Sequence, residues 1–392
     1  MRCDWATELG ASWGSRLYDA GLDLSGPQPC ALVYDEKMIH DRAKEVWSSL
    51  PEFNHCFALK ACPYEGMLRL LGEHGFGFEA ASYQEAFLAG SLFPKSHILY
   101  DGPAKTPDEI KKSAAHGWLL SASHLEEAGK ISAPCFLRVN PMVGAGTIAA
   151  TSLSVKGGRF GEPAGELPLE LPPQIKGLHA HAGSAGCTIG LLAQSARALA
   201  DLACAHPQVE WINIGGGLPA DGSYAEYAKA LKSLVPELFE GRWKVFTEFG
   251  RSVCSRSGRA YSRVESARRG IATIHLGADF LLRRAYRPAD WACPIKALGH
   301  IGEEKNEPAF DQRIAGPLCF AGDELGVVCA PEIKAGDWIE IGACGAYCAS
   351  MWSRHCSRPM PPVYGLRSDG TLSVWSHGET ERDIARLWGM PT

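Results

Sequence analysis

Short runs of apolar residues alternate with amphipathic segments through the first two thirds of the chain. The apolar runs have the length of buried strands, and they cover His55–Lys60, Gly75–Ala80, His97–Tyr100, Trp118–Ser121, Cys135–Val139, Ile175–His181, Val209–Ile214 and Val245–Glu248. Helical periodicity lies between most of them, as in Glu65–Glu73, Tyr83–Ala89, Leu191–Ala205 and Tyr224–Phe239. Because strands that are apolar on both sides need helices on both faces, this alternation predicts a parallel β/α architecture.

The number of predicted strands narrows the fold class. Eight strands within about 200 residues match the size of a (β/α)8 barrel. We therefore expect an α/β fold with a TIM-like barrel over residues 35–265. A doubly wound open sheet shows the same alternation, so the strand count alone does not exclude it.

The pattern changes after residue 265 to glycine-punctuated segments rich in β-forming residues. These segments are Ile271–Leu276, Gly326–Cys329, Trp338–Gly342 and Thr371–Trp375, with a turn or sheet edge at Pro359–Pro362. The apolar run Cys30–Tyr34 precedes the barrel strands and fits either domain. We expect a mostly β domain formed by residues 1–34 and 266–392.

Composition limits the classes of function. Apolar residues make up 46% of the chain and charged residues 21%, as in ordinary globular enzymes. The formal net charge is -5 and no basic run is present, so neither nucleic acid nor a membrane is an expected partner. No secretory signal and no long apolar stretch is visible, and a cytoplasmic protein is expected.

Cysteine is frequent, with 14 residues scattered along the chain and no CxxC pair. Cys344, Cys348 and Cys356 lie near His355, but their spacing fits no common zinc-ligand pattern. Buried reduced thiols are the simpler interpretation, and no metal is expected.

Polar residues gather at the carboxyl ends of the predicted barrel strands, where barrel enzymes carry their chemistry. They are Lys60, Glu79, Ser121, Arg138, His181, Gly215–Gly217 and Glu248. Because these ends meet at one rim of a parallel barrel, we expect the side chains to converge there.

Several of these residues have a chemical and a structural interpretation. Desolvation of Lys60 at the end of an apolar strand favours a neutral amine that can bond a carbonyl carbon, whereas a lysine that reaches into solvent is the alternative. The triplet Gly215–Gly217 presents backbone N–H groups that suit a phosphate, or it forms a tight turn. Glu248 and Arg251 suit a ring nitrogen and a phosphate, or they form a surface ion pair.

Taken in order, the motifs resemble the fold-type III pyridoxal-phosphate decarboxylases, the group IV family of diaminopimelate, ornithine and arginine decarboxylases. The matching segments are FALKA, GFGFEAASYQEAFLAG, LRVNP, HAHAGSA, INIGGGLP, FTEFGR, GPLCFAGDELG and GACGAYCASM. The resemblance covers nearly the whole chain. It implies an alanine-racemase-like architecture, pyridoxal 5'-phosphate as the cofactor, and a homodimer with shared active sites.

The resemblance also implies roles for individual residues. The cofactor-binding set would be Lys60, Glu79, Arg138, His181, Ser184, Gly215, Gly216, Gly217, Glu248, Arg251 and Tyr347. Lys60 would carry the cofactor, His181 would stack on its ring, and Ser184 would touch its phosphate. Glu248 would pair with the pyridine nitrogen, and Arg251 would lie near the phosphate.

In the second domain, the segment GPLCFAGDELG is similar to the motif whose cysteine enters the neighbouring subunit's active site, here Cys319. Tyr347 is similar to a tyrosine that approaches the phosphate. We hypothesise that Cys319 is the acid that protonates Cα after CO2 leaves. Lys60, Cys319 and His181 would then form the catalytic set.

The residue after this cysteine departs from the family pattern. Members that act on basic amino acids or diaminopimelate have Asp or Glu there, and this chain has Phe320. A phenyl ring offers an ammonium group no ion pair, and burying an unpaired charge is costly. The other substrate-binding candidates are Arg283, Arg284 and Tyr286, whose alignment with the family's substrate segment is not fixed by the sequence. An arginine at this place suits a carboxylate. The expected substrate is an amino acid or amino-acid conjugate, such as a carboxylate-siderophore intermediate, rather than a simple basic amino acid.

Other functions remain open. A conventional diaminopimelate or ornithine decarboxylase would bind its substrate differently. An amino-acid racemase shares the fold but uses a second tyrosine base and usually an arginine at the pyridine nitrogen, so Glu248 and Cys319 count against it. An inactive regulatory homologue typically loses Lys60 or Cys319. A metal-dependent barrel hydrolase built on His179 and His181 leaves both of those residues unexplained.

Overall fold

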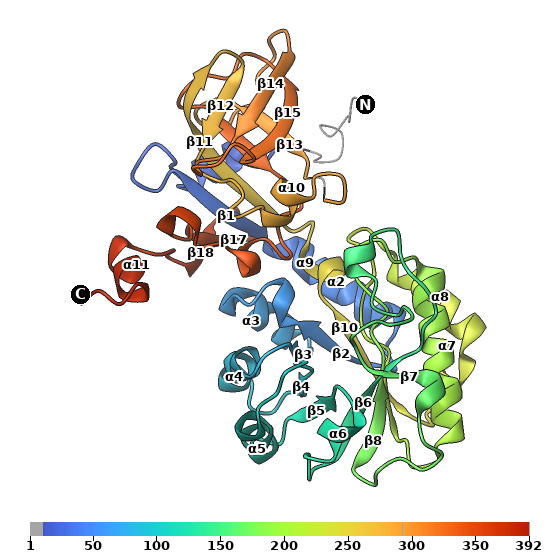
Figure 1. Cartoon of the computed structure of the whole chain (residues 1–392). Helices are drawn as coiled ribbons and strands as arrows, with labels where there is room; N and C mark the ends of the chain where they lie inside the picture. Colours follow the sequence, from blue (N-terminus) through green and yellow to red (C-terminus); the bar gives the residue numbers. More distant parts are fainter. Residues whose placement is uncertain (1–10, 292, 392) are drawn as a thin grey trace. The chain divides into compact units, whose positions relative to one another are not determined.

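The computed structural model describes residues 11–291 and 293–391, so residues 1–10, 292 and 392 of the expected β-rich domain lie outside the described part (Figure 1). The chain divides into two compact units. The first unit contains Ile39–Pro63 and Met67–Cys254. The second contains, of the described residues, 11–38, Tyr64–Gly66, 255–291 and 293–391.

Eight parallel strands, all within the described residues, close into a barrel in the first unit. Around the ring they are β2 (Asn54–Ala58), β3 (Gly77–Ala80), β4 (Ile98–Tyr100), β5 (Leu119–Ala122), β6 (Cys135–Asn140), β8 (Ile175–His179), β9 (Trp211–Asn213) and β10 (Lys244–Phe249). Backbone pairing between β5 and β6, and between β10 and β2, completes the ring. The closed ring confirms the expected barrel and excludes a doubly wound open sheet.

Helices precede or follow the barrel strands. They are α2 (Glu36–Ser49), α3 (Glu65–Glu73), α4 (Tyr83–Leu92), α5 (Pro107–Ala115), α6 (Leu125–Ala128), α7 (Ile189–Ala205), α8 (Tyr224–Leu234) and α9 (Arg251–Cys254). Four of them begin behind a Ser or Thr whose hydroxyl accepts a backbone N–H of the first turn, namely Ser82, Thr106, Thr188 and Ser223. Helices α7 and α8 pack against each other (Figure 1). After β6 the chain forms a loop with the short strand β7 (Glu162–Pro163).

The interior of the barrel is polar at the carboxyl ends of the strands and apolar farther inside. Cys56, Leu99, Phe136 and Phe246 from four different strands form a buried cluster. The rings of Phe136 and Phe246 meet edge to face at 5.5 Å. A packed apolar layer of this kind turns the barrel into a solid support for the polar residues above it.

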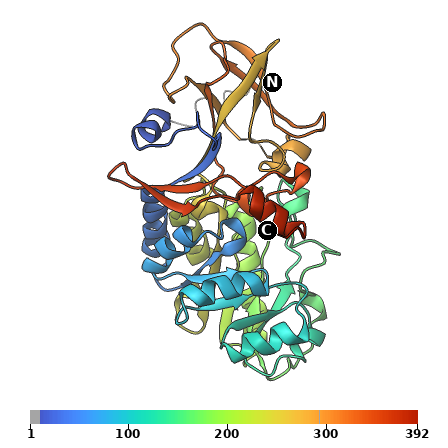
Figure 2. The same cartoon turned by 90° about the vertical axis from the view of Figure 1, so that its left-hand side faces the viewer.

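The second unit is built on a sheet of mixed direction. Its strands are β1 (Cys30–Asp35), β11 (Gly258–Arg268), β12 (Ile271–Ile274), β13 (Ile295–Leu298), β14 (Phe310–Ala315), β15 (Glu324–Ala330), β16 (Trp338–Ile341), β17 (Val363–Leu366) and β18 (Leu372–Ser376). The path β15-β14-β12-β11-β1-β17-β18 is extended by β16, which pairs with β11 and β13. Figure 2 shows β17 and β18 as a red antiparallel ribbon. The α-helices in the described part of this unit include α1 (Gly14–Asp19), α10 (Leu282–Tyr286) and α11 (Glu381–Leu387).

Strand β1 is central to this sheet. It pairs antiparallel with β11 and parallel with β17, so the run Cys30–Tyr34 belongs with the β-rich unit. The boundary expected at residue 265 falls inside β11, which pairs with β1, β12 and β16 along its length. A separate core of this unit includes Trp13, Leu17, Tyr261 and Trp338. None of the described helices is long and apolar enough to cross a membrane.

Candidate active site

Residues at the carboxyl ends of neighbouring barrel strands lie side by side, at the same height along the barrel axis. The pairing register places Arg138 beside His179, and His179 beside Asn213, on three neighbouring strands. In a parallel sheet, residues that are paired in this way point to the same face. Glu79 and Glu248 occupy the last positions but one of β3 and β10.

Lys60 lies in a single turn of 3-10 helix, Leu59–Ala61, directly after β2. Its Nζ is 2.7 Å and 2.6 Å from the two carboxylate oxygens of Glu79, whose side chain is completely buried. The lysine side chain keeps one third of its surface exposed. Its amine is therefore held at the rim of the barrel and not withdrawn into the core.

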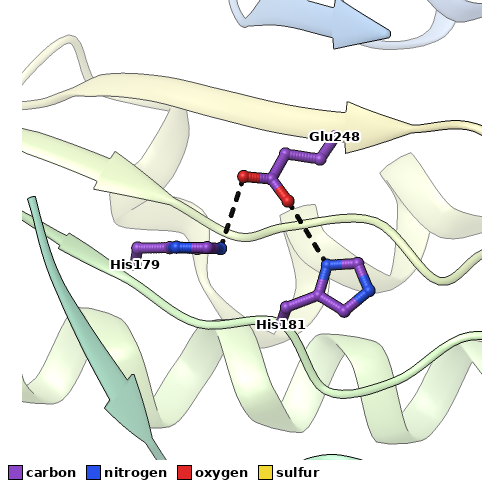
Figure 3. Close-up of side chains that lie close together, drawn as sticks. All are labelled: His179, His181 and Glu248. Carbon is purple, nitrogen blue, oxygen red and sulfur yellow. Dashed lines mark ion pairs between the residues drawn. The ribbon is translucent and has the colours of Figure 1, made fainter. Parts of the chain in front are cut away.

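Glu248 lies between two histidines, which come from the end of β8 and the segment that follows it (Figure 3). Glu248 Oε1 is 3.3 Å from His179 Nε2, and Oε2 is 3.4 Å from His181 Nδ1. Asn213 Nδ2 also donates a hydrogen bond of 2.8 Å to Oε1. The carboxylate is thus fixed through one oxygen more firmly than through the other.

Two further buried groups extend this network. Asp101 directly follows β4, and its Oδ2 accepts a 2.7 Å hydrogen bond from Arg138 Nη1. Its Oδ1 is 3.5 Å from His179 Nδ1. Carboxylate oxygens of Glu79, Asp101 and Glu248 all lie within 4.8 Å of one another. Buried charges of one sign at this distance require paired cations, and Lys60, Arg138 and His179 are placed to provide them.

The protonation of these groups follows from burial and from their partners. Burial raises the pKa of Glu79 to about 7, with Lys60 acting in the opposite direction. Burial would also raise the pKa values of Asp101 and Glu248, but Arg138 and His179 outweigh it for Asp101, and His179 and His181 for Glu248, so both lie below their usual range. Burial opposes protonation of His179, yet Glu248 and Asp101 raise its pKa to about 9. Burial lowers the pKa of His181.

The glycine triplet connects β9 to the rim. Gly215 adopts a φ of +68° and its carbonyl accepts the backbone N–H of Glu248 at 2.8 Å. A Cβ on Gly216 would lie 2.0 Å from the carbonyl oxygen of Glu248. The Gly216 N–H donates to His181 Nδ1 at 3.2 Å. Only glycine allows the loop to pass this close to β10.

The remaining predicted cofactor residues of the barrel lie in the same unit. Ser184 is half-buried three residues after His181, where its backbone N–H donates to Thr151 O. Arg251 begins α9, three residues after Glu248. Both segments therefore leave the barrel on the side where the strands end.

Cys319 belongs to the second unit, in the loop between β14 and β15, and is exposed. Buried Asp323 holds this loop, because its carboxylate accepts the backbone N–H groups of Leu318 at 2.7 Å and Ala278 at 2.6 Å. The ring of Phe320 stacks on Tyr286, with 6.0 Å between centroids and an interplanar angle of 12°. The residue after the cysteine is thus part of an aromatic surface, to which His355 adds an edge contact at 6.2 Å.

The two predicted substrate arginines have different surroundings. The guanidinium of Arg284 donates to the backbone carbonyls of Leu325, Pro288 and Trp291 at 3.0, 3.0 and 3.4 Å. Arg283 lies over the ring of Tyr347 at 5.1 Å. Tyr347 has a φ of +59°, a left-handed conformation that is strained for a residue with a side chain and is common at functional sites. Arg284 thus stabilises the backbone of its own loop, whereas the guanidinium of Arg283 packs on the ring of Tyr347.

The predicted site residues form two groups, one in each unit. Lys60, Glu79, Arg138, His181 and the glycine triplet converge with Glu248 at the barrel rim. Cys319, Phe320, Tyr286, Arg283 and Tyr347 lie in the β-rich unit. Asp101 and Asn213 were not singled out from the sequence. Asp101 follows the apolar run His97–Tyr100 and could have been found by the same strand-end criterion, whereas Asn213 stands inside its run and gave no such signal.

Comparison with known proteins agrees with this geometry. A family model described as the pyridoxal binding domain of pyridoxal-dependent decarboxylases matches residues 36–255. The chain is 28% identical to a diaminopimelate decarboxylase of Actinosynnema pretiosum subsp. auranticum, over 97% of this chain and 90% of the relative. It is 28% identical to that of Escherichia coli (strain K12), over 91% and 92%.

Solved structures share the fold. Diaminopimelate decarboxylase from Helicobacter pylori, complexed with L-lysine, superposes with a TM-score of 0.82 at 21% identity, over 93% of this chain and 98% of that one. The Paramecium bursaria Chlorella virus arginine decarboxylase gives 0.73 at 18% identity, over 87% and 98%. The family model covers more than half of the chain, including the whole barrel. This protein therefore belongs to the pyridoxal-dependent decarboxylase family.

Proposed function

We propose that this decarboxylase removes CO2 from an amino acid or amino-acid conjugate that carries a second carboxylate, with pyridoxal phosphate bound at the barrel rim. The observation that carries the proposal is the convergence of the Lys60–Glu79 pair and Glu248 in one buried network. An amine and a ring-nitrogen acceptor at the same rim are what this cofactor needs to be held and activated.

The residues at the rim fit the cofactor in three respects. Lys60 offers an amine for the aldehyde, and it is held in place by Glu79. Among the described residues, Glu248 Oε2 is buried and accepts no hydrogen bond, so it suits a protonated ring nitrogen. The N–H groups of the glycine triplet, together with Ser184 and Arg251, suit the phosphate.

The residues of the chain then have defined tasks. The cofactor, when bound, supplies an electron sink for the electron pair left at Cα. Glu248 would keep a proton on the ring nitrogen, because the pKa of its carboxyl lies well below the usual range and the group is ionised. His181, whose pKa is lowered by burial, would face the ring as a neutral imidazole. Glu79 keeps Lys60 at the rim when the lysine amine is free.

The proton for Cα is proposed to come from Cys319 of the partner subunit in a homodimer. Its exposed position on the loop after β14 supports a role outside its own unit. The backbone anchoring of this loop by Asp323 would give the thiol a fixed position. Protonation at Cα, and not elsewhere, separates amine release from abortive transamination.

The proposed substrate class rests on Phe320 and Arg283. The stacked rings of Phe320 and Tyr286 replace the carboxylate that would pair with a distal ammonium. Arg283, placed against Tyr347, suits a distal carboxylate. A citrate-linked intermediate of carboxylate-siderophore synthesis has this chemistry. Diaminopimelate is the second candidate, since the relatives reported above bear that name and the substrate carries a second carboxylate.

A cytoplasmic location is proposed as well. No disulfide joins the cysteines that the structure describes. Many thiols, with no disulfide among the described ones, suit a reducing compartment.

The cofactor is tested by absorbance and chemical trapping. After incubation with pyridoxal phosphate and removal of the unbound compound by gel filtration, the protein should keep a visible absorption band, and borohydride should bleach it and leave the label on Lys60 in a peptide map. Lys60→Arg keeps a cation beside Glu79 and should show neither the band nor the label at position 60. A wild-type protein that is colourless after the same treatment would overturn the proposal.

The substrate class is tested by CO2 release from diaminopimelate, lysine, ornithine and citrate-linked amino acids. Wild type should prefer a substrate with a second carboxylate over lysine and ornithine. Phe320→Glu should shift the ratio of kcat/KM toward lysine by roughly 10- to 100-fold, the range of a hydrogen bond to a charged group. An unchanged ratio would remove Phe320 from the substrate site.

A further inference from the structure

The barrel rim contains a second histidine, His179, to which none of the tasks above assigns a role of its own. Its ring is completely buried at the end of β8. Nε2 faces Glu248 Oε1 at 3.3 Å, and Nδ1 faces Asp101 Oδ1 at 3.5 Å and Ser121 Oγ at 2.9 Å. The imidazole therefore lies between two buried carboxylates, as Figure 3 shows for Glu248.

The charges around His179 indicate its protonation. Asp101 and Glu248 face it directly, and Ser121 and Asn213 contribute neutral groups. Arg138 neutralises part of the charge of Asp101, and Lys60 is paired with Glu79. Among the described residues no arginine or lysine forms an ion pair with Glu248, and the charge of Lys60 acts on it less strongly than that of His179. A cationic His179 is therefore its main source of compensation. Two buried carboxylates hold the pKa of His179 above its usual value, although burial acts against protonation.

The position of His179 also bears on the orientation of Glu248. Asn213 Nδ2 donates a 2.8 Å hydrogen bond to Oε1, and His179 Nε2 lies 3.3 Å from the same oxygen, as an ion pair without a hydrogen bond. Among the described residues Oε2 accepts no hydrogen bond, although His181 Nδ1 lies 3.4 Å away. Contacts on one oxygen fix the rotation of a carboxylate and leave its other oxygen to a ligand.

We propose that His179 is a positioning residue that stays cationic between Asp101 and Glu248, and that it orients and keeps ionised the carboxylate which receives the ring nitrogen of the cofactor. The inference rests on the proposed function, because it assumes that Glu248 faces that nitrogen. It adds a residue that does not touch the cofactor and acts through Glu248.

The test compares two ligands of the full-length apoprotein. One is pyridoxal phosphate, and the other is 1-deazapyridoxal phosphate, in which a C–H group replaces the ring nitrogen. Because the deaza compound offers nothing to Glu248, loss of His179 should weaken binding of pyridoxal phosphate only. The readout is the dissociation constant of the deaza compound divided by that of pyridoxal phosphate. Because both ligands use Lys60 and the phosphate site, general effects on these two contacts cancel in the ratio.

His179→Asn should reduce this ratio by roughly 10- to 100-fold, as expected for a lost interaction with a charged group. The matched control is Ser121→Ala, which removes a neutral partner of the same ring and should leave the ratio within about twofold of wild type. His179→Gln fills more of the ring volume and serves if the asparagine variant does not fold. An unchanged ratio in a folded His179 variant would overturn the inference.

The protonation of His179 can be measured without any variant. In the wild-type apoprotein, the nitrogen resonances of His179 should report a doubly protonated ring at pH 7.5, with loss of a proton near pH 9. A neutral ring at pH 7.5 would overturn the inference by itself. If wild type binds neither ligand, the proposed function fails, whereas binding of both with an unchanged ratio in the variants contradicts only the role of His179.

Discussion

Lys60 Nζ lies within 2.7 Å of both carboxylate oxygens of Glu79, on the neighbouring barrel strand. The lysine is partly exposed and the glutamate is completely buried. The pair therefore spans the boundary between the barrel interior and the rim. An amine anchored in this way points at the rim before any ligand arrives.

The first prediction concerns the pH dependence of the stability of the apoprotein. Burial raises the pKa of Glu79 to about 7 from an ordinary value of 4.5. A group with a raised pKa in the folded state adds stability in full below its unfolded pKa and loses it as the pH rises. The free energy of unfolding should therefore fall by up to roughly 3 kcal/mol as the pH rises from 4.5 through 7.

Urea unfolding of wild type and Glu79→Gln at several pH values checks this expectation, because the variant should lack that part of the slope. Glu210→Gln is the matched control. Glu210 is an exposed carboxylate paired with Lys176 at 3.5 Å, and its removal should leave the slope intact. If Glu79→Gln follows the wild-type curve, the carboxyl does not titrate as stated.

The second prediction concerns the close approach of the glycine loop to β10. Gly216→Ala should lower the free energy of unfolding by about 1–3 kcal/mol, since the added methyl group meets the carbonyl of Glu248 at 2.0 Å. It should also weaken binding of pyridoxal phosphate. Gly165→Ala is the control, because a Cβ there meets nothing within 4 Å. Equal stability of the two variants would contradict the packing described.

The third prediction concerns the proposed acid of the reaction. Cys319→Ala should slow turnover by roughly 10²- to 10⁴-fold, or divert part of it to transamination, because Cα loses its proton donor. The measurement is the ratio of amine to carbonyl product together with kcat. Cys329→Ala removes another exposed thiol from the β-rich unit and should change neither. Wild-type rate and product ratio in Cys319→Ala would exclude this role.

The fourth prediction separates the two neighbouring arginines. Arg283→Lys should raise KM for a substrate with a second carboxylate about tenfold with little change in kcat, because lysine cannot form the bidentate contact. Arg284→Lys should instead lower Tm with KM unchanged, since it removes hydrogen bonds to the carbonyls of Leu325, Pro288 and Trp291. The reverse pattern would assign the substrate contact to Arg284.

The barrel could be predicted because its strands are apolar on both faces and bounded by glycine or polar residues. All eight expected runs overlap a barrel strand, and the helix expected over Glu65–Glu73 has those bounds. The rim residues could be predicted because the carboxyl ends of parallel strands must meet. Glu79 and Glu248 could be assigned to one site from the sequence only because both stand at the carboxyl ends of predicted strands.

Other features depend on contacts between distant segments and left little signal. The long strand β11 mixes buried and exposed positions and reads as an irregular segment, yet it pairs with β1, β12 and β16. The cationic character predicted for His179 depends on Asp101, which lies far away in the sequence. The different tasks of Arg283 and Arg284 follow from which carbonyls lie within reach, and no spacing in the sequence encodes that.

The contact between Gly216 and the carbonyl of Glu248 has a consequence for how this protein can diverge. As long as β10 follows its present path, every amino acid other than glycine is closed to position 216. A lineage is therefore expected to keep the barrel rim almost unaltered while it explores new substrates. New substrate preferences are expected from positions such as Phe320, where a side chain can be exchanged without a shift of the backbone. The two units would then accumulate mutations at different rates.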